Sequence, residues 1–423
     1  MNKSKQECYI NSQKVITTTD IERKQNAEIL TPLSLVNEML SKIPEDAWTD
    51  ISTGHLPLIF DPCVGKGAFV VVVYDLLWEK LEDLIPDEEN RRATILEEML
   101  YFADINPYNI NVTKLILDPQ NHYKLNAYCG DTLEMKFDTK FDIIVGNPPF
   151  NNSQNNTGKK GGGDSLWNKF VIKSIKCLKP RGYLLYVHPS GWRKPESSKS
   201  KYYGLFKLMT QENQMLYLSI HGLKDGKNTF DCGTRYDWYV IHHTSKYTTT
   251  EFNDEKNNRL IIDMNKFKWL PNYNIDTIQS ILAEESDEKC PIIYNRSNYG
   301  SDKKYTQKYK TNEFKYPCVH STPRKGIRYM YSSVNDRGHF GISKVIFGES
   351  GIGYVIIDME GKYGMTQGAM SIEVSSIEEA NNIKKALLSV KFKQLLNACS
   401  FSNFRIDWRM FKYLKKDFWK EFI

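Results

Sequence analysis

The sequence has no pair of cysteines at C-x-x-C spacing and no apolar run as long as a signal peptide or a membrane span requires. Its eight cysteines are scattered, and its eight histidines lie near none of them at the spacing of a zinc site. The most apolar run, residues 69–73, meets Asp75 two residues later. We therefore predict free thiols, no bound metal, no membrane segment and a reducing cytoplasm as the compartment.

The overall net charge of +6 hides an uneven distribution along the chain. Residues 1–150 carry 14 lysines and arginines against 24 aspartates and glutamates, a net of −10, which leaves 43 against 27, a net of +16, for the remainder. An acidic first part joined to a basic second part indicates that only the second binds a polyanion. A chance bias of a solvated surface is the plainer alternative.

Short apolar segments alternate with helical ones over the first half of the chain. Four predicted strands end in turn at Asp61, Asp104, Asp131 and Asn147, and helical patterns follow most of them. This alternation predicts an α/β fold with a doubly wound, mainly parallel sheet covered by helices on both faces. The polar, glycine-rich stretch 151–165 is predicted to be a mobile loop.

The length of 423 residues favours two domains. We place a polar N-terminal arm at 1–28, the doubly wound domain at 29–250 and a second, mixed α/β module at 251–423.

Three carboxylates are expected at one edge of this sheet, because the carboxyl ends of parallel strands meet there. Gly65 and Gly67 follow Asp61 and let backbone approach a ligand at a helix N-terminus. Asp61 suits a cationic group, Asp104 the hydroxyls of a ribose, and Asp131 an exocyclic adenine amine. Together they predict an adenosine-bearing cofactor; carboxylates that only stabilise turns are the structural alternative.

The tetrapeptide Asn147-Pro148-Pro149-Phe150 follows the fourth apolar strand directly. The two prolines lack N–H donors and hold the chain extended, so the Asn147 side-chain oxygen and the Pro148 carbonyl can converge on one amino group. Two acceptors match the two hydrogens of adenine N6, and Phe150 can stack on a base that has left the duplex. A proline turn that merely closes a buried strand is the alternative.

These residues together resemble the gamma-type N6-adenine DNA methyltransferases, in particular the methylase part of type II and type IIG restriction-modification enzymes. The resemblance covers about residues 28–245 and implies a Rossmann-like catalytic domain using S-adenosyl-L-methionine, followed by a target-recognition domain. It implies base flipping, double-stranded DNA as the substrate and a separate restriction endonuclease as a possible partner, and leaves monomer or dimer open.

The resemblance also implies a role for each matching residue. Thr31 and Pro32 match the motif that contacts the methionine end of the cofactor. The segment from Asp61 through Pro62 to Gly67 matches the glycine turn. Asp104 matches the ribose ligand and Asp131 the adenine contact of the cofactor. Asn147, Pro148, Pro149 and Phe150 match the catalytic motif, and Asn147 also lies at the cofactor. Phe150 and Phe230 match the rings that stack on the target base.

Two features depart from the family pattern. The interval from Asp61 to Asp104 exceeds the spacing of about 20 residues that is usual between a glycine turn and a ribose carboxylate. Type IIG enzymes also carry a nuclease domain ahead of the methylase, and only a short stretch precedes Thr31 here. The triplet Glu360-Gly-Lys362 resembles a nuclease E-x-K element, but such triplets are common by chance, so we assign no nuclease.

Basic and aromatic residues interleave in three later segments, 199–207, 321–330 and 401–416, as expected for contacts with DNA. For the last of them, docking of an amphipathic helix on the core is an equal alternative. Competing functions are methylation of a protein glutamine or an RNA base by the same chemistry, and a catalytically silent DNA-binding fold. Methylation of cytosine N4 is a minor variant.

Overall fold

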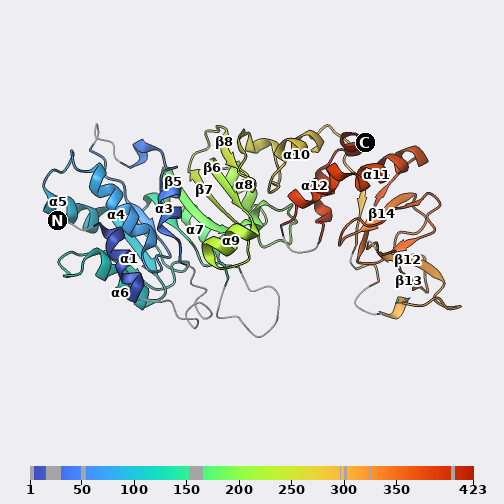
Figure 1. Ribbon diagram of the computed structural model, residues 1–423, viewed down its shortest axis with the longest axis horizontal. Coiled ribbons are helices and arrows are strands. Elements are labelled where there is room, and N and C mark those ends of the chain that lie inside the picture. The colour runs from blue at the N-terminus through green and yellow to red at the C-terminus, as the bar shows by residue number, and fades with distance from the viewer. Residues whose placement is uncertain are drawn as a thin grey trace. The chain divides into compact units, whose positions relative to one another are not determined.

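The computed structural model describes residues 4–15, 30–48, 54–151, 165–295, 297–299, 303–323, 325–401 and 405–423. The chain divides into two compact units, which Figure 1 shows with their elements labelled. The first contains residues 1–192 and 199–265, and the second contains residues 193–198 and 266–423. Most of the loop predicted at 151–165, and most of the arm predicted at 1–28, lies outside the described residues.

The first unit is built on a sheet with the strand order β3-β2-β1-β4-β5-β7-β6-β8-β9. The strands from β3 to β5 are parallel to their neighbours in the sheet, β5, β7 and β6 pair antiparallel, and β8 returns parallel to β6. The strands are β1 (Ile59–Asp61), β2 (Leu100–Asp104), β3 (Asn126–Cys129), β4 (Phe141–Gly146), β5 (Leu178–Pro189), β6 (Gln214–His221), β7 (Tyr236–His242), β8 (Thr250–Asn253) and β9 (Arg259–Ile262).

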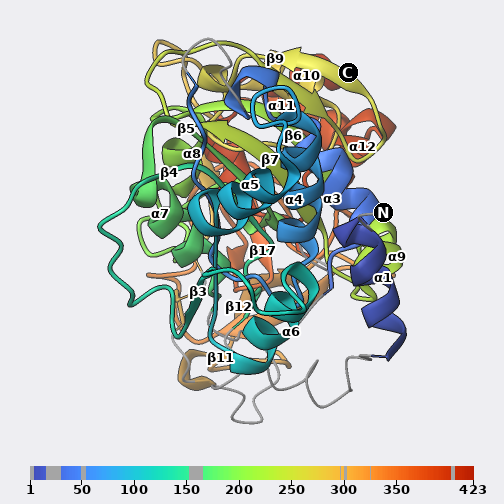
Figure 2. The ribbon, with the colours of Figure 1, turned by 90° about the vertical axis from the view of Figure 1, so that its left-hand side faces the viewer.

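Helices cover both faces of this sheet, as the doubly wound prediction requires. α4 follows β1 and packs with α1 and α3 on one face, where Figure 2 shows them together. α7 lies on the other face, where the Ser174 hydroxyl is 2.6 Å from the Tyr186 hydroxyl. The α-helices are α1 (Lys5–Val15), α3 (Leu33–Leu40), α4 (Ala68–Lys80), α5 (Glu88–Ala93), α6 (Pro107–Leu117), α7 (Trp167–Cys177), α8 (Leu205–Thr210) and α9 (Leu223–Phe230).

The valine run 70–73 lies in α4 although β-branched residues favour strands. All four valines are buried, so packing against the sheet and against α1 and α3 outweighs the local preference. Gly67 begins the helix in a left-handed conformation (φ 93°), where a Cβ would lie 3.1 Å from the Thr113 hydroxyl oxygen.

Two predicted boundaries differ from the structure. The first unit continues through β8 and β9 to residue 265, so the sheet does not end at 250. β3 ends at Cys129, and Asp131 lies two residues beyond it. The described part of the N-terminal arm is the helix α1, whose first N–H groups bind Asp75: those of Lys5 and Gln6 lie 2.8 and 3.0 Å from the carboxylate oxygens, and the Ser4 hydroxyl also donates to it.

The second unit contains two small sheets, ordered β10-β17-β14-β15 and β11-β13-β12-β16. Residues 377–398 form two helices, separated at Ser389, whose side chain accepts the N–H of Phe392. The elements are α10 (Ile275–Ile281), α11 (Ile377–Leu388), α12 (Val390–Ala398), β10 (Ile292–Ile293), β11 (Thr306–Gln307), β12 (Tyr316–Ser321), β13 (Arg328–Ser332), β14 (Lys344–Gly348), β15 (Ile356–Asp358), β16 (Gly364–Met365) and β17 (Ala369–Glu373).

The basic, aromatic segment 401–416 packs on the core of this unit through one side. It forms a short 3₁₀ helix, Trp408–Tyr413, in which Met410 and Phe411 are buried, while Arg405 and Lys412 are exposed. The docking alternative therefore holds for the apolar side chains. No helix in the described ranges is long and apolar enough to span a membrane.

A buried ion pair joins β14 to β15 in the second unit. Lys344 Nζ lies 3.0 Å from Asp358 Oδ2, both side chains are almost completely buried, and Asp358 also accepts the N–H groups of Lys362 and Tyr363. We predict that Asp358→Ala lowers the free energy of unfolding by about 3–5 kcal/mol, because it leaves the Lys344 ammonium buried without a counter-charge. Urea unfolding followed by fluorescence measures this loss.

Glu360→Ala is the matched control, because Glu360 pairs with Lys362 at 2.7 Å on the surface, where both side chains are mostly exposed. It should leave the urea midpoint unchanged. Equal losses in both variants would contradict the assignment of stability to the buried pair.

Candidate functional site

The order β3-β2-β1-β4-β5 reverses direction between β1 and β4, and ligands of open α/β sheets bind outside the carboxyl ends of the strands at such a point. Asp61 is the last residue of β1, and Asn147 directly follows β4. Gly146 (φ 154°) is the last residue of β4 and faces the Asp61 side chain, because a Cβ at this position would lie 3.0 Å from Asp61 Oδ1. The glycine therefore leaves room for the carboxylate beside the Asn147 backbone.

Asp61 is 1% exposed, and its Oδ1 accepts the Cys63 N–H at 3.0 Å. Burial raises the pKa of its carboxyl group to about 8, and the nearby Asp104 carboxylate contributes to the rise. A carboxyl with such a pKa gains strongly from a cationic partner, since a positive charge favours its ionised form.

Asp104 at the end of β2 holds the glycine turn that follows β1. Its Oδ2 accepts the Gly65 N–H at 2.9 Å and its Oδ1 accepts the Asn106 N–H at 2.8 Å. Burial raises the pKa of Asp104, and these hydrogen bonds oppose the rise. The long interval from Asp61 to Asp104 is taken up by α5 and a π-helical stretch, residues 94–99, so Asp104 still reaches the turn.

Asp131 is exposed, and its Oδ1 accepts the Leu133 N–H at 2.9 Å. The adjacent Thr132 hydroxyl donates to the Pro62 carbonyl at 2.7 Å, which fastens this loop to the turn after β1. Each of the three carboxylates thus accepts an N–H from the residue two positions later, as the structural alternative expected. A carboxylate has about four lone-pair sites, so this turn role leaves capacity for a ligand.

Asn147 has one side-chain atom satisfied and one not. Its Nδ2 donates to the Thr31 hydroxyl at 3.1 Å, whereas its Oδ1 is buried and has no hydrogen-bond partner among the described residues. An unsatisfied buried acceptor costs about 1–3 kcal/mol, and such atoms in native proteins often have a functional role. The bond to Thr31 fixes the amide so that Oδ1 remains available to a donor.

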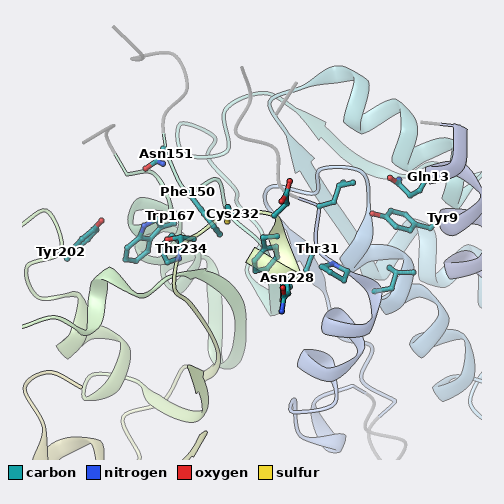
Figure 3. A pocket seen from close by; sticks show the side chains of 17 residues that line it. Tyr9, Gln13, Thr31, Phe150, Asn151, Trp167, Tyr202, Asn228, Cys232 and Thr234 are labelled. Atoms are coloured by element: carbon teal, nitrogen blue, oxygen red, sulfur yellow. The ribbon is translucent and has the colours of Figure 1, made fainter. Parts of the chain in front are cut away.

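Phe150 and Phe230 lie in a cavity of about 850 Å³ within the first unit. Both are 7% exposed, and their rings meet edge to face with centroids 6.4 Å apart. The lining side chains, seen in Figure 3, come from α1, the start of α3 and the residues before it, the segment after β4, α7, the end of β5, the segment before α8, and α9 with its connection to β7. They are Tyr9, Gln13, Leu30, Thr31, Pro32, Leu33, Phe150, Asn151, Trp167, Pro189, Tyr202, Asn228, Thr229, Phe230, Asp231, Cys232 and Thr234.

The structure thus distributes the predicted site residues over two neighbouring places. Thr31, Pro32, Phe150 and Phe230 line the cavity. The glycine turn and the three carboxylates do not line it and lie at the carboxyl ends of the first three strands. The hydrogen bond between Asn147 and Thr31 links the two places.

Several residues near the site were not predicted from the sequence. Tyr9 and Gln13 of α1 line the cavity, and Gln13 Nε2 is buried without a partner among the described residues. α1 is too polar to reveal a buried face, and its position depends on Asp75, which is distant in sequence. Ile105, directly after Asp104, is 62% exposed, and this exposure is visible only in the structure.

Comparisons with known proteins match this arrangement. Residues 74–225 match the Eco57I restriction-modification methylase family. The matched segment includes Asp104, Asp131 and the Asn147 tetrapeptide, but not Thr31, Asp61 or Phe230. The resemblance to restriction-modification adenine methylases is thereby confirmed.

Two curated proteins are similar over part of their length. An adenine-specific methylase of Mycoplasma pneumoniae, itself uncharacterized, is 23% identical over 246 residues, 41% of this chain and 57% of that protein. The methylase subunit of the type I restriction enzyme MjaIX of Methanocaldococcus jannaschii is 28% identical over 139 residues, 32% of this chain and 21% of that subunit. The chain therefore spans about half or less of these relatives.

Two solved structures resemble nearly the whole chain. A nuclease-deletion mutant of the Type ISP restriction-modification enzyme LlaGI, in complex with a DNA substrate mimic, matches 92% of this chain and 45% of its own with a TM-score of 0.54 and 12% identity. The Type ISP enzyme LlaBIII bound to DNA matches 95% of this chain and 40% of its own chain, with a TM-score of 0.53 and 11% identity. At this identity the likeness concerns the fold, and it agrees with the predicted Rossmann-like methyltransferase sheet.

The unpartnered oxygen makes a prediction about stability. Asn147→Ala should change the free energy of unfolding by less than about 1 kcal/mol, because it removes an unsatisfied acceptor together with one hydrogen bond. Asn213→Ala should cost about 1–3 kcal/mol, because Asn213 is buried and satisfied by Leu208 O at 2.8 Å and His243 Nδ1 at 2.9 Å. Urea unfolding of both variants compares them; a larger loss at Asn147 would show that its oxygen is satisfied in solution.

Proposed function

We propose that this chain is a site-specific DNA methyltransferase that transfers a methyl group from S-adenosyl-L-methionine to N6 of a flipped-out adenine. The carrying observation is Asn147 at the end of β4, with its amide nitrogen held by Thr31 and its Oδ1 buried and unpartnered. The family match and the Rossmann-like fold support this assignment.

The residues present fit this cofactor. S-Adenosyl-L-methionine carries an ammonium, a sulfonium, two ribose hydroxyls and an adenine ring, and the site offers the buried Asp61, the glycine turn and Asp104 at successive strand ends. Asp61 would hold the ammonium, Asp104 the ribose and Asp131 the adenine amine, with Ile105 against the adenine ring. Thr31 and Pro32 would contact the methionine end.

The residues of this chain prepare the amino group for transfer. Asn147 Oδ1 and the Pro148 carbonyl accept the two N6 hydrogens, which turns the nitrogen lone pair out of conjugation with the ring. Phe150 and Phe230, whose rings meet edge to face, would offer ring surfaces on which the base stacks, and Pro149 keeps the strand exit extended. When bound, the cofactor would supply an electrophilic methyl group on its sulfonium and leave as the neutral thioether, and the amino group that accepts the methyl would release one proton to solvent.

Double-stranded DNA is the proposed partner, bound in part by basic residues of the second unit, and a separate restriction endonuclease is a second candidate. The proposed compartment is the cytoplasm. Within this proposal, residues 29–250 and their continuation to 265 form the catalytic domain, and the second unit is the target-recognition domain.

Transfer of tritiated methyl to unmethylated genomic DNA, RNA and a release-factor protein, assayed in parallel, tests the proposal. We expect label in DNA alone, recovered as N6-methyladenine, and at least about a 100-fold lower kcat for Asn147→Ala, by analogy with removing one preorganised hydrogen-bonding group from an active site. The Asn213→Ala variant controls for general loss of structure. Label in RNA or protein alone, or as N4-methylcytosine, would refute adenine methylation of DNA.

The raised pKa of Asp61 predicts pH-dependent cofactor binding. Below pH 8 the carboxyl of the ligand-free chain is mostly protonated, so binding an ammonium must first remove a proton. Affinity for S-adenosyl-L-methionine should therefore rise by up to about 10-fold per pH unit toward pH 8 and level off above it. Calorimetric titration between pH 6 and pH 9 measures this slope.

Asp61→Asn serves as the control for this experiment, because the amide does not titrate while the ligand's own groups still do. The variant should bind more weakly and without the slope that belongs to Asp61. Identical pH profiles for the two proteins would contradict a direct contact between Asp61 and the cofactor.

A further inference from the structure

A second aromatic pair lines the same cavity, away from Phe150 and Phe230. The Trp167 and Tyr202 rings stack with centroids 4.9 Å apart and planes 27° apart. His188 stacks on Trp167, with centroids 4.2 Å apart. In Figure 3, Trp167 and Tyr202 lie at one end of the row of lining side chains, and Tyr9 and Gln13 lie at the other.

The three stacked rings form a rigid platform whose outer member is Tyr202. His188 and Trp167 are almost fully buried, Tyr202 is half-buried, and His188 Nε2 is hydrogen-bonded to the Tyr239 hydroxyl at 2.9 Å. Gly191 permits this packing, since a Cβ there would lie 2.9 Å from the Tyr202 ring. The Tyr202 ring is therefore held in place before any ligand binds.

The segment before α7 fixes this platform relative to the proposed base site. Asn151, next to Phe150, forms an isolated β-bridge with Ser165, two residues before Trp167. The bridge brings the two aromatic pairs to the same cavity although the chain between them is long. A cavity of about 850 Å³ lies toward the upper end of the range of about 300–1,000 Å³ typical of ligand pockets, and one purine ring does not require it all.

The surroundings of Tyr202 are cationic. Lys201 and Lys199 are exposed, and Lys201 Nζ lies 5.3 Å from the centroid of the Tyr202 ring. A flat ring beside ammonium groups is the combination that binds a nucleotide, with the base on the ring and the phosphate at the cation.

We propose that Tyr202 is the stacking platform for a nucleotide adjacent to the target adenine in the same strand. This inference rests on the proposed function, in which the target base itself stacks at Phe150 and Phe230. The platform holds the neighbouring base beside the cavity while Lys201 contacts its phosphate. Tyr202 thereby adds affinity for the distorted strand and influences which neighbour is accepted.

A double-mutant cycle between protein and DNA tests this contact. The wild-type full-length chain first methylates genomic DNA, and sequencing gives the modified adenine and its neighbours. Duplexes with this site are then made intact, or with an abasic nucleotide at the target or at either neighbour. Their dissociation constants are measured by fluorescence anisotropy with S-adenosylhomocysteine present.

Tyr202→Ala should weaken binding of the intact duplex by about 5- to 150-fold, the range for removing one base–aromatic stack. Removing the base at one neighbouring position should abolish this difference, while an abasic target should preserve it. Tyr202→Phe should bind as the wild type does, which separates stacking from loss of the hydroxyl. Thermal unfolding of both variants identifies any loss of folding.

Tyr203→Ala is the matched control, because Tyr203 is the next residue, is 66% exposed and does not line the cavity. It should show no coupling to any abasic position. Equal effects of Tyr202→Ala on all duplexes, coupling only to the target position, or no effect at all would each overturn the platform. If the wild type forms N6-methyladenine, any of these results leaves the proposed function standing and overturns the platform alone. If the wild type transfers no methyl group to DNA, the proposed function and the platform are both overturned.

Discussion

One hydrogen bond, from the Asn147 amide to the Thr31 hydroxyl, joins parts of the chain that are 116 residues apart and determines what the site can do. It uses the nitrogen of the amide and leaves the oxygen buried without a partner among the described residues. The bond also connects the strand edge with its carboxylates to the aromatic cavity. Without it the amide could rotate, and this buried acceptor would lose its direction.

The sheet topology explains why this contact can exist. Because the strand order reverses between β1 and β4, the residues that follow these two strands meet at the same edge of the sheet. Gly146 then permits the Asp61 carboxylate to lie beside β4. The sheet topology, Gly146 and the bond to Thr31 thus place the buried Asp61 carboxyl group near the unpartnered Asn147 Oδ1.

The sequence was sufficient to predict the sheet and much of its edge. β1 and β2 end at the expected residues, and β4 ends one residue before Asn147, because each is a short apolar run closed by a polar residue and a turn. β3 was predicted too long, because it is a half-exposed edge strand whose alternation continues into the turn at Gly130. The predicted boundary at 250 left β9 and most of β8 outside the first domain, since the pairing of β8 with β6 and of β9 with β8 has no local signal in the sequence.

The sequence predicted only those site residues that belong to recognisable motifs. The role of α1 could not, because its place is set by the Asp75 carboxylate binding its first N–H groups, and neither partner is unusual in sequence. The stack of His188, Trp167 and Tyr202 likewise joins three segments that no spacing rule relates.

The position of α1 has a pharmacological consequence. Tyr9 and Gln13 form one wall of the cavity, yet they lie outside residues 74–225, the part shared with the methylase family. A small molecule that entered the cavity and reached Gln13 would meet a buried amide nitrogen that lacks a partner among the described residues, and an acceptor group on that molecule could satisfy it.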